Sequence, residues 1–305
     1  MYEFIKNNVE TSDKIFLDAP NRIPLSFNEL HQKLEKVRNN FDNLSINRSD
    51  PVAIVLPNGP DLGFLFIACS CFAISAPLNP NYSKNEFKFY LSDLKAKFLI
   101  VDPDLKTEAS KAAFELGITV INLSFEQNIG SLKLTKNNES SPITTISNYE
   151  KDTSLLLHTS GTTSKPKLVQ LSSNNLIKSS RNIGKTLYLN EEDSCLNIMP
   201  LFHIHGLVAV LLTSLVYNIK LVCTSGFNAL NFYKFLQDYK PSWYSGVPTM
   251  HQAILQRSKN NQDIIKNSPL RFIRSSSAPM PKPVLLEIEK TFNCPVIEAY
   301  GMTEA

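Results

Sequence analysis

Short apolar runs alternate along the chain with longer segments in which apolar residues recur every three or four positions. Extended apolar runs occupy residues 51–56 and 98–101, and each ends at a turn that contains proline. Helical spacing occurs at residues 27–41 and 87–94, whose apolar positions form one buried face. This alternation predicts an α/β fold with largely parallel sheets.

The most hydrophobic stretch of the chain is residues 62–78. It is interrupted by Gly63, Ser70, Ser75 and Pro77. It also falls short of the ~20 apolar residues that a bilayer span needs. We therefore expect a buried helix that leads to a turn, and no transmembrane segment.

A polar, asparagine-rich stretch follows near residues 130–150. Polar runs of this kind are typical of surface connections. We take this stretch as the candidate internal boundary between two parts of the fold.

Composition narrows the class of protein. The chain has 305 residues, of which 43% are hydrophobic, so it can bury a large core in more than one lobe. The net charge is only +3, and the dispersed lysines form no basic stripe, which argues against a nucleic-acid partner. Five cysteines without metal-type spacing, and an N-terminus without a secretory pattern, favour a cytoplasmic protein. The sequence leaves open whether a longer form carries a C-terminal targeting signal.

The segment Leu155–Lys167 runs from an apolar strand into a loop rich in hydroxyls and positive charge. A helix capped within Ser173–Asn175 follows. One glycine, with a proline between the two lysines, does not match the Walker pattern, which argues against a P-loop phosphotransferase. The hydroxyls and lysines suit a polyphosphate, whereas an ordinary polar turn is the alternative. The candidate phosphate-binding residues are Thr159, Ser160, Gly161, Thr162, Thr163, Ser164, Lys165 and Lys167.

The residues His158–Lys167 resemble the phosphate-binding signature of the adenylate-forming superfamily, which includes the acyl-CoA synthetases. The segment Tyr300–Ala305 resembles the second signature of that family. This segment contains the carboxylate of Glu304, and Mg²⁺ prefers one or two carboxylates together with phosphate oxygens. The resemblance assigns nucleotide binding to Tyr300, Gly301 and Thr303, magnesium to Glu304, and catalytic roles to Thr303 and Glu304.

Residues 199–207 resemble the histidine-bearing motif of the same family. His203 takes the place of the gating residue between the carboxylate pocket and the pantetheine tunnel, so the resemblance makes it a catalytic and substrate-contacting residue. His205, Val247 and His251 are further substrate candidates. The imidazole of His205 or of His251 could instead donate a hydrogen bond to a backbone carbonyl.

A serine-rich turn follows the stretch that ends at Arg274. The corresponding turn of the family lines the adenine site, although such clusters are also common in plain turns. The candidate adenine-binding residues are Ser275, Ser276, Ser277, Ala278 and Pro279.

Within the family, these motifs look closest to the oxalate-CoA ligase branch. The resemblance implies that residues 1–305 form an N-terminal AMP-binding domain of two stacked α/β lobes, without the small C-terminal lid domain. It implies ATP, Mg²⁺ and coenzyme A as cofactors and co-substrates. The expected reaction joins a carboxylate, oxalate or another small acid, to coenzyme A through an acyl-adenylate and releases AMP. A fatty acid would instead need an apolar tunnel.

The chain departs from the family pattern at two places. Leu168 stands where the family usually has glycine, and a positive φ there would cost about 1 kcal/mol or more. The sequence stops at Ala305, before the ribose-binding aspartate, the hinge and the adenylation lysine of the family. We therefore expect a truncated form with little activity of its own. The alternative is a non-catalytic nucleotide-binding fragment or pseudoenzyme.

Overall fold

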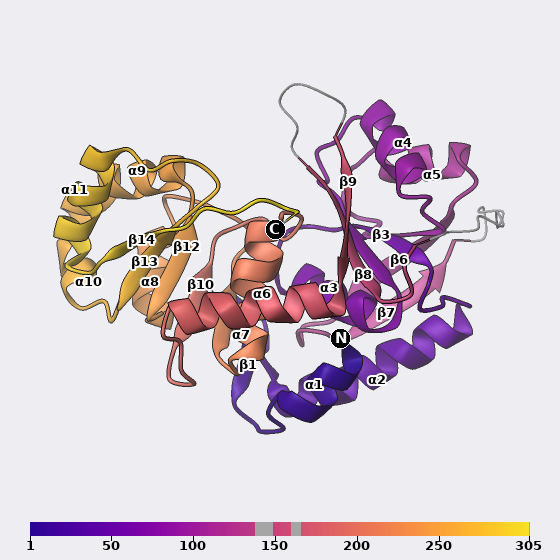
Figure 1. Ribbon diagram of the computed structural model, residues 1–305, viewed down its shortest axis with the longest axis horizontal. Coiled ribbons are helices and arrows are strands. Elements are labelled where there is room, and N and C mark those ends of the chain that lie inside the picture. The colour runs from indigo at the N-terminus through magenta and orange to yellow at the C-terminus, as the bar shows by residue number, and fades with distance from the viewer. Residues whose placement is uncertain (138–148, 160–165, 305) are drawn as a thin grey trace.

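The computed structural model describes residues 1–137, 149–159 and 166–304, which form two seven-stranded sheets (Figure 1). The first sheet contains β1 (Ile15–Asp18), β2 (Leu25–Ser26), β10 (Ser194–Asn197), β11 (Lys220–Cys223), β12 (Trp243–Gly246), β13 (Phe272–Ser275) and β14 (Val296–Glu298). Its spatial order is β14-β13-β12-β10-β11-β1-β2, and its strands are parallel except for the pairing of β1 with β2.

The second sheet lies beside the first. It contains β3 (Pro51–Val55), β4 (Ile74–Pro77), β5 (Phe98–Val101), β6 (Thr119–Phe125), β7 (Leu132–Lys136), β8 (Thr153–His158) and β9 (Leu168–Ser172). Its order is β7-β6-β5-β3-β4-β8-β9, with antiparallel strands at both edges. The predicted α/β class with largely parallel sheets is therefore confirmed.

Helices cover both faces of each sheet. The α-helices are α1 (Tyr2–Asn8), α2 (Phe27–Asn43), α3 (Pro60–Phe72), α4 (Lys84–Asp93), α5 (Ala109–Glu115), α6 (Ser173–Thr186), α7 (Thr213–Val216), α8 (Phe232–Tyr239), α9 (Pro248–Arg257), α10 (Gln262–Lys266) and α11 (Lys282–Phe292). A π-helix, η1 (His205–Leu212), and a 3₁₀-helix, η2 (Ser258–Asn261), complete the set in the described residues.

The hydrophobic core is divided among the layers. Helices α8 to α11 pack on the outer face of the first sheet, and α4 and α5 pack on the outer face of the second. Between the sheets, α1, α2, α3, α6, α7 and η1 share one core with residues of both sheets. We call the first sheet with α8 to α11 the first lobe, and the second sheet with α4 and α5 the second lobe. A common core therefore joins the two lobes.

Strand β3 shows why its sequence is apolar throughout. Val52 and Ile54 belong to the core between the sheets, whereas Ala53 and Val55 face α4 and α5. Side chains of a strand alternate between its two faces, and here both faces are covered. An uninterrupted apolar run is the sequence pattern that such a strand requires.

The hydrophobic stretch at residues 62–78 is only partly a helix. Residues 60–71 of α3 are all buried, as expected for a helix that is apolar on every side. The turn predicted after it is wrong, because Ile74–Pro77 forms β4 between β3 and β8. Pairing with strands distant in sequence decided the conformation of these residues. Among the described helices, none has the length and apolar character of a bilayer span.

The connection from β8 to α6 also differs from the prediction, in which one loop led from the strand directly to the helix. Strand β9 intervenes and pairs antiparallel with β8, with Leu168 opposite His158. Leu168 is not among the residues with positive φ, so the strain anticipated for a leucine at this position does not arise. The capping residue of α6 is Ser172, whose hydroxyl accepts a hydrogen bond from the Asn175 amide, rather than a residue within Ser173–Asn175.

The candidate boundary near residues 130–150 lies within one sheet. It contains β7 and ends just before β8, and both strands belong to the second sheet. The chain passes from one sheet to the other between β2 and β3 and again between β9 and β10. The second lobe is thus an insertion between the parts of the first.

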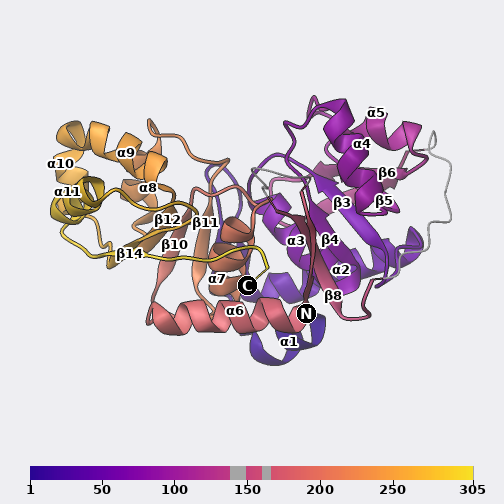
Figure 2. The same cartoon turned by 45° about the horizontal axis from the view of Figure 1, so that its top comes forward.

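The carboxyl ends of the parallel strands position the loops that carry the sequence motifs. The segment 199–207 follows β10, the serine-rich turn follows β13, and Tyr300 to Glu304 follow β14. In the second sheet, Thr159 follows β8. Ligands of open parallel sheets bind outside the carboxyl ends of the strands. Two views show the C-terminal segment running from the first lobe towards α6 and the second lobe (Figures 1 and 2).

The turn between β10 and η1 packs closely against Gly206, the second residue of η1. A Cβ on Gly206 would overlap the carbonyl oxygen of Pro200. We expect Gly206→Ala to lower the free energy of unfolding by about 2 kcal/mol, because the backbone must shift to relieve the overlap. Chemical denaturation measures this change.

Gly301→Ala is the matched control for that substitution. An added Cβ at Gly301 meets no atom within 4 Å, so its unfolding free energy is expected to change by less than about 0.5 kcal/mol. Equal effects of the two substitutions would contradict the packing argument.

His251 on α9 is fully buried against β12, with its Nδ1 3.2 Å from the Tyr244 hydroxyl. Burial lowers the pKa of His251 to about 4 from its ordinary 6.5. Below pH 6.5 the unfolded chain therefore binds a proton that the folded chain does not. The stabilising effect of neutral His251 is complete above that pH and is lost as the pH falls towards 4.

His251→Gln tests this linkage. The variant is expected to be less stable than the wild type at pH 7.5, with the difference shrinking by about 2 kcal/mol near pH 4.5. Urea unfolding of both proteins at several pH values gives the difference between their free energies of unfolding. The acid sensitivity of all other groups is common to both proteins and cancels in this difference. A difference that is constant with pH would contradict the lowered pKa.

Candidate functional site

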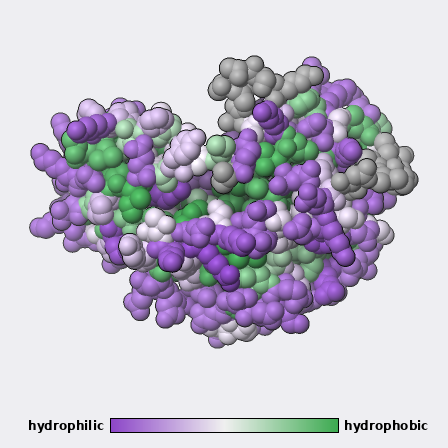
Figure 3. Space-filling view, in the orientation of Figure 1, coloured by the Kyte–Doolittle hydropathy of each residue, from purple (hydrophilic) through white to green (hydrophobic). Residues whose placement is uncertain are grey.

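A cavity of about 710 Å³ lies where loops from both lobes meet. In the space-filling view the outline is notched between the lobes, with hydrophobic surface beside the notch (Figure 3). Each contributing loop follows the carboxyl end of a strand. The strands and their cavity residues are β4 with Asn79, β8 with Thr159, β10 with Met199, Phe202 and His203, β12 with Val247, β13 with Ser277, and β14 with Met302, Thr303 and Glu304.

The start of the predicted phosphate loop forms one wall of this cavity. The Thr159 amide donates to the Lys167 carbonyl at 2.9 Å, and the Lys167 amide donates to the Thr159 hydroxyl oxygen at 3.1 Å. These bonds close the hairpin at the point where the loop begins. Thr159 lines the cavity, whereas the Lys167 side chain is exposed outside its lining. Six predicted loop residues lie outside the described residues: Ser160, Gly161, Thr162, Thr163, Ser164 and Lys165.

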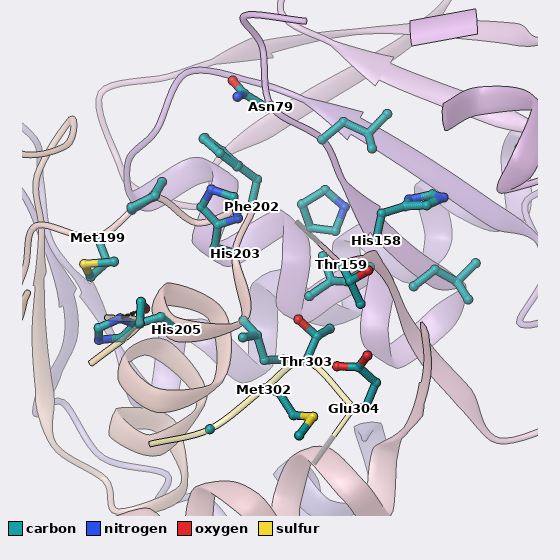
Figure 4. Close-up of a pocket in the computed structure, with 18 of the residues that line it drawn as sticks. Asn79, His158, Thr159, Met199, Phe202, His203, His205, Met302, Thr303 and Glu304 are labelled. Atoms are coloured by element: carbon teal, nitrogen blue, oxygen red, sulfur yellow. Dashed lines mark hydrogen bonds between the residues drawn. The ribbon is translucent and has the colours of Figure 1, made fainter. Parts of the chain in front are cut away.

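The C-terminal signature reaches the same cavity. Thr303 and Glu304 lie near Thr159 in the close-up, and all three line the cavity (Figure 4). The described residues contain no group of three or more His, Cys, Asp or Glu that could hold a metal ion. A single exposed carboxylate is nevertheless what Mg²⁺ uses when substrate phosphates and water supply the other ligands. Glu304 therefore fits magnesium bound together with a nucleotide.

His203 faces the cavity from the turn before η1. Its ring lies 4.6 Å from that of Phe202, and both residues line the cavity (Figure 4). Desolvation by the surrounding walls lowers the pKa of His203, so the neutral imidazole prevails at neutral pH. A neutral ring at this place can accept or donate one hydrogen bond without repelling a cation.

His205 is buried at the edge of the cavity and is held on both sides. Its Nδ1 lies 3.0 Å from the Ser277 hydroxyl, and its Nε2 lies 2.7 Å from the Ser245 hydroxyl and 3.0 Å from Arg274 Nη1. A guanidinium can only donate, so Nε2 is the accepting nitrogen and Nδ1 carries the proton. Burial, assisted by the Arg274 charge, lowers the pKa of His205 to about 3.

Ser277 adopts an unusual backbone conformation at this place. Its φ of 73° lies in the left-handed region, which serine rarely occupies. Strained residues of this kind are typical of binding sites. The left-handed turn lets Ser277 line the cavity while it bonds to His205.

An aromatic cluster on the second lobe was missed by the sequence prediction. Tyr90 belongs to the segment 87–94, whose apolar positions were expected to form one buried face, but it lines the cavity together with Tyr82 and His158. The rings of Tyr82 and Tyr90 stack at 4.5 Å, and the His158 ring lies 4.7 Å from Tyr90. Asp93 fixes the His158 ring through a 2.8 Å contact with Nε2. The helical spacing of Tyr90 gave no signal for this role, because it matched an ordinary core face.

Several predicted residues lie elsewhere. His251 is fully buried behind β12 and lines neither this cavity nor the neighbouring one. Ser275 is buried and bonds to Met280, and Ala278 and Pro279 are exposed outside both cavities. Ser276 and the exposed Tyr300 line a neighbouring cavity of about 400 Å³, while Gly301 borders both.

Sequence comparison assigns this arrangement to a family. Residues 4–305 match the AMP-binding enzymes. A probable CoA ligase of Humulus lupulus is 39% identical over 290 residues, covering 92% of this chain and 55% of the relative. An oxalate–CoA ligase of Arabidopsis thaliana is 36% identical over 300 residues, covering 96% of this chain and 58% of the relative. The chain thus spans little more than half the length of these relatives.

Solved structures agree in fold. ATP-bound MatB from Rhodopseudomonas palustris superimposes with a TM-score of 0.83 at 21% identity, covering 99% of this chain and 59% of that one. O-succinylbenzoate coenzyme A synthetase from Bacillus subtilis, in complex with AMP, gives a TM-score of 0.76 at 25% identity, covering 96% of this chain and 57% of that one. The match along nearly the whole chain places this protein in the family of AMP-binding, adenylate-forming enzymes, whose two-lobed fold it shares.

Proposed function

We propose that this chain forms the adenylation site of an AMP-forming acid–CoA ligase. One observation carries the proposal: the first residue of the phosphate loop, Thr159, shares a cavity with His203, Thr303 and Glu304. These residues come from three distant segments and both lobes. Relatives named as CoA ligases, including the oxalate–CoA ligase at 36% identity, support the same reaction class.

The first step needs a carboxylate oxygen aligned with the α-phosphorus of ATP. The phosphate loop and Lys167 supply hydrogen bonds and positive charge to the polyphosphate, and Thr303 donates its hydroxyl to the α-phosphate. Glu304 would hold Mg²⁺, which would offset phosphate charge. Attack by the carboxylate breaks the bond to pyrophosphate and forms an acyl-adenylate. Holding the reactants in line is the main contribution of such a site.

The second step transfers the acyl group to coenzyme A. The thiol of coenzyme A attacks the acyl-adenylate carbonyl, and AMP leaves. His203 stands at the cavity wall between the phosphate-binding residues and Met199, where it can separate the carboxylate from the approach of the thiol (Figure 4). Because the His203 ring is neutral, it can turn into or out of the path of the thiol without the cost of desolvating a charge.

Release of pyrophosphate tests the reaction class. We expect ATP, Mg²⁺ and a panel of carboxylates to give pyrophosphate with a longer product of the gene, and little or none with residues 1–305 alone. Release by neither form with any acid would contradict the ligase proposal. Nucleotide binding without release by either form would instead support the non-catalytic alternative.

Lys167→Ala tests the phosphate loop. Loss of one cation beside the triphosphate is expected to weaken ATP binding by about 10- to 100-fold. Lys185→Ala, which removes an exposed charge near the end of α6, is the control and is expected to bind ATP normally. Calorimetric titration with ATP measures both. Unchanged affinity of Lys167→Ala would count against the loop as the phosphate site.

A further inference from the structure

The turn that carries His203 is held from the other sheet by an asparagine. Asn58 lies in the loop between β3 of the second sheet and α3. Its Oδ1 accepts a hydrogen bond from the Leu201 amide at 2.7 Å, and its Nδ2 donates to the Thr224 carbonyl at 3.2 Å. Leu201 belongs to the turn after β10, and Thr224 directly follows β11, both in the first sheet. One side chain therefore ties the carboxyl end of β3 to the ends of two strands in the other sheet.

The two loops that Asn58 contacts are also joined to each other. Asn197, the last residue of β10, is fully buried. Its carbonyl accepts hydrogen bonds from the Thr224 amide at 3.2 Å and from the Thr224 hydroxyl at 2.8 Å. Its side chain accepts from the Met199 amide and donates to the Met199 carbonyl, both at 3.1 Å. Together with the bonds of Asn58, these close a ring around the turn, and satisfied buried networks of this kind hold a single arrangement.

Leu201 is fixed by its side chain as well as by its amide. The side chain is fully buried and packs against α3, where its Cδ1 lies 3.4 Å from the position that a Cβ on Gly63 would take. The next two residues, Phe202 and His203, line the larger cavity (Figure 4). A backbone has only two soft dihedral angles per residue, so fixing Leu201 limits the places that the His203 ring can reach.

The side chain of Asn58 neither caps its own helix nor lines a cavity. Within the described ranges of the chain it makes no hydrogen bond to α3, whose N-cap is Gly59. It is not among the residues that line either the larger or the neighbouring cavity. An asparagine side chain offers a carbonyl oxygen and an amide nitrogen on one planar group. Both groups are used here to bridge the backbone of two loops.

We propose that Asn58 is a positioning residue, which sets the place of His203 between the phosphate-binding residues and the approach of coenzyme A. The inference rests on the proposed ligase function, in which His203 separates the carboxylate from the thiol. Asn58 acts through Leu201 and does not contact the substrates. Loss of its side chain frees the Leu201 amide and lets the turn move, which displaces the His203 ring from the cavity wall.

The protonation of His203 reports the place of its ring without requiring any activity. Desolvation by the surrounding walls lowers the pKa of His203. In Asn58→Ala the displaced ring is better solvated, so its pKa is expected to rise by about 0.5 unit or more towards the ordinary 6.5. Proton NMR titration of the imidazole signals of residues 1–305 measures this pKa. The variant His203→Gln identifies the His203 signal among those of the five histidines.

Two further variants distinguish positioning from general loosening. Ser242→Ala removes the 2.6 Å hydrogen bond to Asp193 at the amino end of β12, away from the cavity. It is expected to lower the melting temperature and to leave the pKa of His203 unchanged. Asn58→Gln keeps both amide groups on a longer side chain, and a smaller rise in the pKa of His203 is expected. Circular dichroism and thermal unfolding confirm that each variant folds.

Steady-state kinetics of a longer product of the gene give a second readout. Asn58→Ala is expected to lower kcat for the formation of the coenzyme A thioester by about 10- to 100-fold, since a displacement of about 1 Å has effects of this size. The KM for ATP is expected to stay nearly unchanged, because the residues proposed for phosphate lie on other segments. Ser242→Ala is expected to keep the wild-type kcat.

The outcomes separate this inference from the proposed function. A rise in the pKa of His203 in Asn58→Ala, absent in Ser242→Ala, would support the positioning of His203 by Asn58 even if no form releases pyrophosphate and the ligase function fails. An unchanged pKa in folded Asn58→Ala, or an equal rise in Ser242→Ala, would overturn the inference and leave the ligase function standing. A higher KM for ATP with unchanged kcat would likewise overturn it. If Asn58→Ala does not fold, a rise in the pKa of His203 in Asn58→Gln supports the inference, and an unchanged value overturns it.

Discussion

Coverage of both faces of two parallel sheets is the constraint on which the structure depends. Parallel strands are stable when both faces are buried, and here one core between the sheets joins α3, η1 and strands of each sheet. That shared core sets the two sheets side by side. Because the loops at the carboxyl ends of the strands then meet, residues as distant as Thr159 and Thr303 line one cavity.

The site combines neutral and charged groups through burial. His205 stays neutral because it is desolvated beside Arg274, so the guanidinium meets an acceptor rather than a second cation. Ser277 supports this arrangement from a left-handed turn that serine seldom adopts. The result is one buried positive charge held by neutral partners at the edge of the cavity.

Much of the fold was readable from local pattern, and the failures share one cause. The helix at residues 27–41 and the strand at 51–56 follow from spacing and capping residues that act within a few positions. In contrast, Ile74–Pro77 became a strand, and Leu168 became the first residue of β9. Both conformations depend on pairing with strands whose proximity no local pattern reveals. Tyr90 was misplaced for a related reason, since a cavity face and a core face have the same helical spacing.

The sequence by itself determined the α/β class and the family signatures, because these depend on local order and composition. Tertiary structure decided which of those residues share a cavity: it brought His203, Thr303 and Glu304 together and left His251 buried elsewhere. It also decided that the side chain of Arg274 is buried. An arginine in a sequence is by default a solvated charge, and only packing between β12, η1 and β14 buries this one beside an opening without a carboxylate partner in the described residues.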